Sequence, residues 1–119
     1  QESLYMAGVV LDNSREAILV TDSNINIVMV NKAFTDIEGY TVEEMLGKNP
    51  NILNSGKHDS GYFQQMYKSL KDTGVFQSEI WNRRKNGEIH PGILIITAVK
   101  NVKQKVTHYV SVFTDITSL

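Results

Sequence analysis

Three histidines, His58, His90 and His108, are the side chains of this sequence best suited to acid–base or metal chemistry. They fall on different predicted elements and lack the spacing of zinc ligands, so a metal site has little support. There is no cysteine to act as a nucleophile or a metal ligand. A serine nucleophile elbow, a His-Glu-x-x-His pair and a phosphate-binding glycine loop are also missing. We therefore expect a domain without catalytic activity of its own.

The composition narrows the class of partner. The chain has 119 residues, of which 41% are hydrophobic and 21% charged, as expected for one globular domain. Its net charge is -1 and its basic residues are scattered apart from 83–85, which argues against nucleic-acid binding. The longest aliphatic run, 93–96, is too short to span a membrane. Together with the absence of cysteine, this predicts a cytoplasmic location without direct membrane contact.

Local patterns predict two short helices in the first half of the chain. Asn31 is suited to cap a helix that ends at Gly39, because an asparagine oxygen accepts the free N–H groups of a first turn. Thr41 and Glu44, three residues apart, form a capping box for the next helix. Both helices come before the apolar strands predicted for the second half of the chain.

A longer helix is predicted between 59 and 74. Asp59 or Ser60 caps its start and Gly74 ends it. The helix has one apolar face, because hydrophobic residues recur at helical spacing at Phe63, Met66, Tyr67 and Leu70.

The remaining segments are predicted strands, separated by polar turns. An Asn-Gly pair at 86–87 is typical of a hairpin turn. Of the neighbours Ile80 and Trp81 only one side chain can face the helices, and an outward Trp81 would mark a partner surface. We expect Ile93 and Ile95 to pack beside alternate residues of the last strand, namely Tyr109, Ser111 and Phe113. The predicted strands are 17–21, 25–30, 75–84, 89–99 and 106–114.

Several recurrent motifs accompany this order of elements. They are Ile-Leu-Val-Thr-Asp at 18–22, Ile-Val-Met-Val-Asn-Lys-Ala-Phe at 27–34, Gly-Tyr at 39–40, Glu-Met-Leu-Gly-Lys-Asn-Pro at 44–50, Trp-Asn-Arg-Arg-Lys-Asn-Gly-Glu at 81–88 and Thr-Asp-Ile-Thr at 114–117. In this order they closely resemble the PAS domain family. The resemblance implies an α+β, profilin-like fold, which is a five-stranded antiparallel sheet with helices packed on one face. It also implies that the first and last strands are neighbours at the centre of the sheet.

The resemblance further implies a domain organisation. Residues 14–117 form a single PAS domain, 1–13 a flanking helix, and 118–119 the start of a linker to a covalently attached effector. Because the chain starts at Gln1 instead of Met and ends on Leu119, we expect it to be a fragment of a longer protein. Leu4, Ala7 and Leu11 form an apolar stripe on the flanking helix, which predicts a homodimer formed through this helix and the sheet.

Sensory signal transduction is the function that the resemblance implies. Such a domain binds a small molecule or cofactor in a pocket between helices and sheet, and relays its state to the effector. Segments 54–59 and 80–84 are similar to PAS modules of cyclic-di-GMP signalling proteins and of two-component sensor histidine kinases, which suggests a diguanylate cyclase, a phosphodiesterase or a histidine kinase as effector. The alternative is a ligand-free dimerisation and protein-interaction module whose core is filled by Phe34, Met45, Phe63 and Tyr67.

Flavin is one cofactor that the resemblance allows. Pro50 stands where light-sensing relatives need a cysteine, which excludes their photochemistry but leaves a redox-type flavin open. Asn49 and Asn82 match polar residues at the flavin edge, whereas Gly92 and Phe113 replace an asparagine and a glutamine. Both asparagines have a structural alternative, with Asn49 bonding the backbone near Pro50 and Asn82 on a solvated strand face. The residues predicted for the pocket are Asn31, Phe34, Asn49, Leu53, Asn82 and Phe113.

Haem is the other cofactor to consider, with His58 as its ligand. The spacing from Leu53 to His58 is shorter than in haem-binding relatives, and Ser78 stands where they have an arginine. The alternative for His58 is an exposed loop residue beside a helix cap. A domain without any cofactor is the third possibility.

Four residues are candidates for signal relay. Glu44 and Lys85 match an ion pair that links helix and strand across the pocket in many PAS domains; the alternative is a capping residue and a solvated lysine. Asp115 and Thr117 stand where the family joins its last strand to a helical linker, and either is able to cap that linker. The alternative is a polar strand end without a signalling role.

Overall fold

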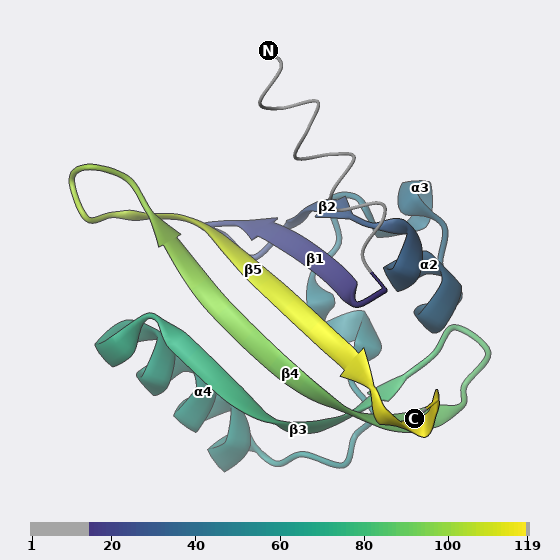
Figure 1. The fold of residues 1–119 in the computed structure, drawn as a ribbon. Coiled ribbons are helices and arrows are strands. Elements are labelled where there is room, and N and C mark those ends of the chain that lie inside the picture. Colours follow the sequence, from purple (N-terminus) through teal and green to yellow (C-terminus); the bar gives the residue numbers. More distant parts are fainter. Residues whose placement is uncertain (1–14, 119) are drawn as a thin grey trace.

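The computed structural model describes residues 15–118, whose fold is drawn in Figure 1. Its strands form one antiparallel sheet in the order β2-β1-β5-β4-β3, which confirms the predicted fold class. The helix predicted for 1–13, with Leu4, Ala7 and Leu11, lies outside the described residues. The elements are β1 (Ala17–Asp22), β2 (Ile27–Val30), α2 (Lys32–Glu38), α3 (Val42–Met45), η1 (Pro50–Leu53), α4 (Ser60–Thr73), β3 (Val75–Arg83), β4 (Ile89–Lys100), β5 (Val106–Asp115) and η2 (Ile116–Ser118).

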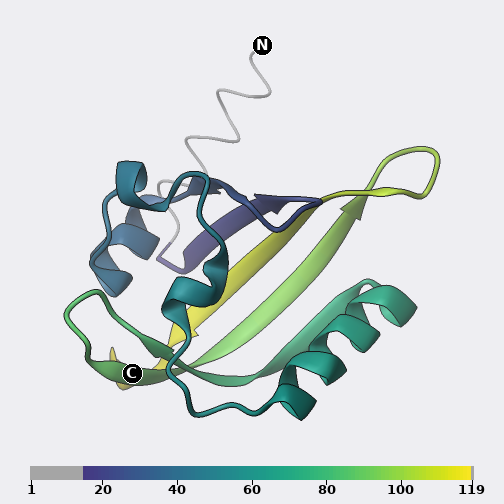
Figure 2. The same ribbon diagram turned by 180° about the vertical axis from the view of Figure 1, so that it is seen from behind.

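The last strand, β5, lies between β1 and β4, so the predicted neighbourhood of first and last strands is confirmed. Leu19 of β1 is opposite Ser111 of β5, and Leu94 of β4 is opposite Phe113. Residues directly opposite each other share one face of a sheet. Figure 2 shows that the helices lie on one side of the sheet. These four residues line the pocket that is described below.

The prediction for Ile93 and Ile95 is wrong by one residue. Leu94 and Ile96 face the helices and are buried, whereas Ile95 lies opposite Val112 and is 37% exposed. The run 93–96 is aliphatic at every position, so alternation along it does not reveal which pair points inward.

The predicted helix boundaries are confirmed by their caps. Side-chain oxygens of Asn31, Thr41 and Asp59 each accept a backbone N–H of the following first turn. Thr41 and Glu44 form the complete capping box. Gly74 ends α4 with a φ of 79°, a conformation that costs glycine little.

The core has two parts, one beneath each group of helices. Tyr67 belongs to neither, because it is 60% exposed, and its predicted role as a core residue is therefore wrong. The first part lies against α2, α3 and η1 and contains Ala17, Leu19, Ile27, Val30, Phe34, Met45, Leu53 and Phe113. The second lies between α4 and the sheet and contains Met66, Leu70, Phe76, Leu94 and Ile96.

Candidate ligand pocket

A pocket of about 780 Å³ lies on the helix-bearing face of the sheet, between the two parts of the core. In Figure 2, α4 lies along one side of β4 and β5, and the segment with η1 lies along the other. A cavity of this size with an apolar lining and a few polar groups is typical of small-molecule sites. Its apolar lining includes Leu19, Leu53, Phe63, Met66, Ile96 and Phe113.

Asn31, predicted for the pocket, is not among the residues that line it. Its Oδ1 accepts the backbone N–H groups of Ile18 and Phe34 at 2.9 and 3.0 Å, and its Nδ2 donates to the carbonyl of Glu16 at 2.9 Å. The side chain is buried and fastens β1 to the start of α2. The other residues predicted for the pocket do line it, namely Phe34, Asn49, Leu53, Asn82 and Phe113.

The groups that a flavin edge needs are largely engaged or absent. Asn49 is exposed, and its Oδ1 accepts the N–H of Asn51 at 2.9 Å, which is the structural role considered for it. Gly92 has no room for a side chain, because a Cβ there would collide with the ring of Phe113. The amide nitrogen of Asn82 is also engaged, as described next. Of the four positions that the resemblance links to a flavin edge, Asn49 and Asn82 thus line the pocket, while Gly92 and Phe113 offer no polar side chain.

Asn82 joins the pocket to a buried carboxyl group. Asn82 is only 7% exposed, and its Nδ2 donates to Oε2 of Glu38 at 3.0 Å. Glu38, the last residue of α2, is fully buried. Its burial raises the pKa of Glu38, and hydrogen bonds from His90 and Asn82 offset only part of that effect. Asn82 is thus not on a solvated strand face.

His90 extends this arrangement toward the end of the sheet. Its Nε2 lies within hydrogen-bond distance of Oε1 of Glu38, at 2.8 Å. Its Nδ1 is buried without a hydrogen bond within the described chain and lies 3.8 Å from Oδ1 of Asp115. The ring packs edge-on against Phe113, with centroids 5.2 Å apart. We call Glu38, Asn82, His90 and Asp115 the polar cluster.

Asp115 fixes the end of β5 through both carboxylate oxygens. Oδ2 pairs with the guanidinium of Arg84 at 3.3 Å, and Oδ1 accepts the N–H of Thr117 at 2.9 Å at the start of η2. Burial acts to raise the pKa of Asp115, but the hydrogen bonds from Thr117 and Arg84 outweigh it and hold the pKa below its ordinary value. Arg84 also donates to the carbonyl of Ile37. Asp115 and Thr117, both predicted relay residues, are therefore in direct contact.

Glu44 and Lys85 form the predicted ion pair, at 2.5 Å. Both roles considered for Glu44 occur together, because Oε2 meets Lys85 while Oε1 accepts the N–H of Thr41 in the capping box. The hydrogen bonds from Lys85 and Thr41 lower the pKa of Glu44. Lys85 also donates its backbone N–H to the carbonyl of Glu38 at 2.8 Å, so this turn contacts both α2 and α3.

His58 lines the pocket, but its geometry does not suit haem ligation. Its Nε2 accepts the backbone N–H of Trp81 at 3.0 Å, and its ring packs against Tyr62. Trp81 is 41% exposed at the pocket edge, with Nζ of Lys57 5.8 Å from its ring, while Ile80 packs against the core. No cluster of three potential metal ligands occurs among residues 15–118.

Sequence reasoning missed Glu38 and His90. Glu38 stands at the end of a short helix, where a glutamate is usually exposed, and His90 is 52 residues away in the chain. The one available signal was the alternation of side chains along a strand. It places His90 on the same face of β4 as Gly92 and Leu94.

Comparisons with known proteins agree with this architecture. The family model described as PAS domain matches residues 15–118. A nitrogen fixation regulatory protein of Klebsiella oxytoca is 28% identical over 106 residues, covering 89% of this chain and 21% of that protein. A blue-light-activated histidine kinase of Brucella anthropi is 30% identical over 91 residues, covering 76% and 18%. The chain thus spans about a fifth of the length of these relatives.

Solved structures show the same fold. The PAS domain of a Colwellia psychrerythraea protein superposes with a TM-score of 0.90 at 21% identity, covering 98% of this chain and 99% of that one. An RNA-binding light-oxygen-voltage receptor gives a TM-score of 0.87 at 24% identity, covering 96% and 33%. Among the described residues, none of the helices is both long and apolar enough to cross a membrane. The match over residues 15–118, with the sheet order and the helices on one face, shows that this chain belongs to the PAS domain family.

Proposed function

We propose that this PAS domain is a sensor that binds a small, mostly apolar molecule in the 780 Å³ pocket and relays its presence to an attached effector domain. One observation carries the proposal: Asn82 lines the pocket and also belongs to the polar cluster that ends at Asp115. A ligand that moves Asn82 therefore changes the hydrogen bonding of Glu38 and His90. Networks of hydrogen bonds and ion pairs of this kind are able to carry energetic coupling between two sites.

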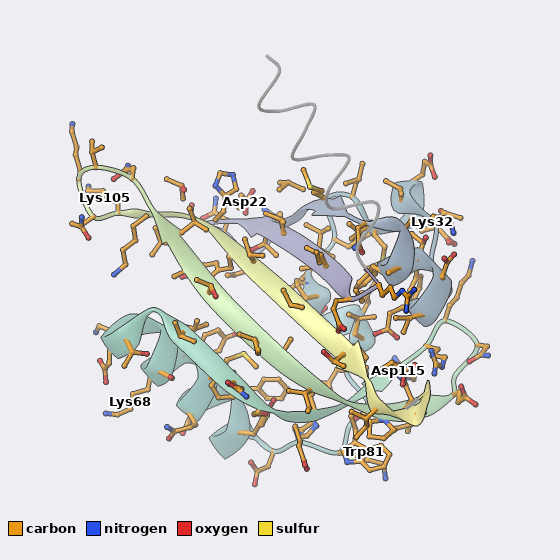
Figure 3. All side chains as sticks on the ribbon, viewed as in Figure 1. Asp22, Lys32, Lys68, Trp81, Lys105 and Asp115 are labelled. Carbon is orange, nitrogen blue, oxygen red and sulfur yellow. The ribbon has the colours of Figure 1, made fainter. Side chains whose placement is uncertain are left out.

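The effector attaches beyond η2 in this proposal. Figure 3 places Asp115 at the C-terminal end of β5, at the same end of the sheet as Trp81. The names of the relatives support a histidine kinase as effector, and a cyclic-di-GMP enzyme is the other class that the sequence suggests. Asn49 and Asn82 in the lining keep a redox-type flavin among the candidate ligands, whereas His58 does not suit haem.

A purified domain tests the binding step. Native mass spectrometry of protein isolated from cells should show the mass of the chain plus a ligand, and its absorption spectrum shows whether that ligand is a flavin. Asn82→Ala should weaken ligand retention, whereas Arg83→Ala, the exposed neighbour on the same strand, should not. A domain that is isolated empty and binds no added compound contradicts the proposal.

The longer protein tests the relay step. Asp115→Ala removes the contacts to Arg84 and Thr117 but no atom of the pocket lining. Effector output should then stop responding to the ligand while pocket occupancy is kept. Normal regulation in this variant, beside the wild type, contradicts the relay route.

The outer face of the sheet favours a second function, association with another copy. Exposed apolar side chains there include Val75, Ile95 and Val99, at 44%, 37% and 40%. Pairing of this face is compatible with ligand binding, since the pocket is on the opposite face. Sedimentation of the wild type and of Ile95→Glu tests this association. The same molecular mass in solution for both proteins contradicts a dimer through this face.

A further inference from the structure

The pocket is elongated along two neighbouring strands. Its lining runs from Leu94 to Lys100 on β4 and from Phe113 to Val106 on β5, and the register places these residues opposite each other. Because a strand advances about 3.3 Å per residue, the six steps from Leu94 to Lys100 span about 20 Å. Asn82 lies at the Phe113 end, which we call the inner end.

Lysines from two elements lie at the opposite end, which we call the mouth and which Lys71, Lys100 and Gln104 line. Lys71 lies in the last turn of α4, and Lys100 is the last residue of β4. The N–H of Ala98 donates to the carbonyl of Gly74 at 2.8 Å, which fastens the end of α4 to β4. Both lysines therefore line the same end of the pocket.

The charge of the mouth has no counterpart in the described protein. No Asp or Glu lines the pocket among residues 15–118, and within this range neither Lys71 nor Lys100 has an ion-pair partner. Lys68, one turn earlier on α4, differs because it pairs with Asp72 at 3.4 Å. Two cations at the rim of an apolar cavity favour a ligand with an anionic group between them.

Two residues with left-handed backbone conformation also line the pocket. Ile25 and Gln104 are the non-glycine residues with positive φ in the described part of the chain, both at 64°, and both line the pocket. A β-branched residue such as Ile25 rarely adopts this conformation. Each belongs to a hairpin turn, in which Ile25 donates its N–H to the carbonyl of Asp22 and Gln104 donates to that of Asn101.

We infer that the pocket takes an elongated anionic amphiphile, such as a medium-chain carboxylic acid. Its apolar body lies along β4 and β5 toward the inner end, and its carboxylate lies at the mouth between Lys71 and Lys100. This inference rests on the proposed sensory function and names the ligand class for the same pocket.

Dodecanoate and dodecan-1-ol test it, because they share one chain and differ in the charge of the head group. Both are titrated below their aggregation concentrations into the full chain, with calorimetry and the fluorescence of Trp81, the one tryptophan of the sequence, as readouts. Dodecanoate should bind about three- to tenfold more tightly than the alcohol, given the modest strength of exposed ion pairs. Added salt should reduce that preference.

Lysine variants assign the preference to the mouth. The pair Lys71→Gln with Lys100→Gln should lose the preference for the acid and keep the affinity for the alcohol. The matched pair Lys68→Gln with Lys103→Gln removes the same charge from residues outside the lining and should behave like the wild type.

The outcomes separate this inference from the proposed function. Equal binding of acid and alcohol, or a preference that survives in the Lys71 and Lys100 variant, overturns the anionic class and leaves a sensory pocket. If neither compound binds but the isolated domain carries another ligand, the inference again fails and the proposed function stands. If neither compound binds and the domain is isolated empty, both fail.

Discussion

Gly92 packs against Phe113, which lines the inner end of the pocket, and Gly92→Ala tests this packing. A Cβ at this position would lie 2.6 Å from the carbonyl oxygen of Thr114 and closer still to ring atoms Cζ and Cε1 of Phe113. Ordinary contacts between such atoms are about 3.5–4 Å. The ring is held in place by His90, and the carbonyl belongs to the central strand β5.

The expected cost follows from this overlap. Overpacking a core position costs about 1–3 kcal/mol, and the fixed backbone oxygen puts Gly92→Ala near 3 kcal/mol. Urea unfolding, monitored by circular dichroism, measures the difference. Adding Phe113→Leu should restore only part of the loss, because the oxygen of Thr114 remains.

Gly61→Ala is the matched control, since Gly61 lies in the first turn of α4 and the nearest atom to an added Cβ would be Oδ1 of Asp59, at 3.3 Å. Helix propensity favours alanine there by about 0.5–1 kcal/mol, so this variant should be no less stable than the wild type. If Gly92→Ala keeps the stability of the wild type within about 0.5 kcal/mol, the close packing of β4 against Phe113 is refuted.

Two further predictions concern buried polar groups. Asn31→Ala leaves the N–H groups of Ile18 and Phe34 without an acceptor and should lower the free energy of unfolding by about 2–4 kcal/mol in urea; a loss below about 0.5 kcal/mol contradicts the role assigned to Asn31. Because the pKa of Glu38 is raised in the folded state, its charged form opposes folding once the pH exceeds the ordinary value of 4.5. The wild type should therefore lose stability relative to Glu38→Gln as the pH rises from below 4.5 to neutral, and a difference that does not depend on pH contradicts the raised pKa.

Features set by neighbouring residues were predictable from the sequence. The caps at Asn31, Thr41 and Asp59 depend on a side chain and an N–H group three residues away, so a short pattern specifies them. The ion pair of Glu44 with Lys85 was reached through the family resemblance, because 41 residues separate its members.

Features set by packing were not predictable. Tyr67 has the spacing of a core residue, but α4 contacts the sheet through Met66 and Leu70 and leaves Tyr67 beside the pocket. The pairing of Glu38 with His90 joins two elements that no local pattern relates. Asn31 matches the pattern of a helix cap. Its Oδ1 accepts the N–H of Phe34 in that cap, so the side chain is not available to contact a ligand.

The central claim is that pocket occupancy reaches the end of β5, and the backbone amide of Thr117 reports it directly, because this N–H donates to Asp115. Its NMR signal is compared between the domain as isolated, the domain after ligand extraction and refolding, and Asn82→Ala reloaded with the same ligand. The account predicts a shift of the Thr117 signal on ligand loss in the wild type and none in Asn82→Ala. Spectral changes confined to residues that line the pocket, with Thr117 unmoved, would contradict it.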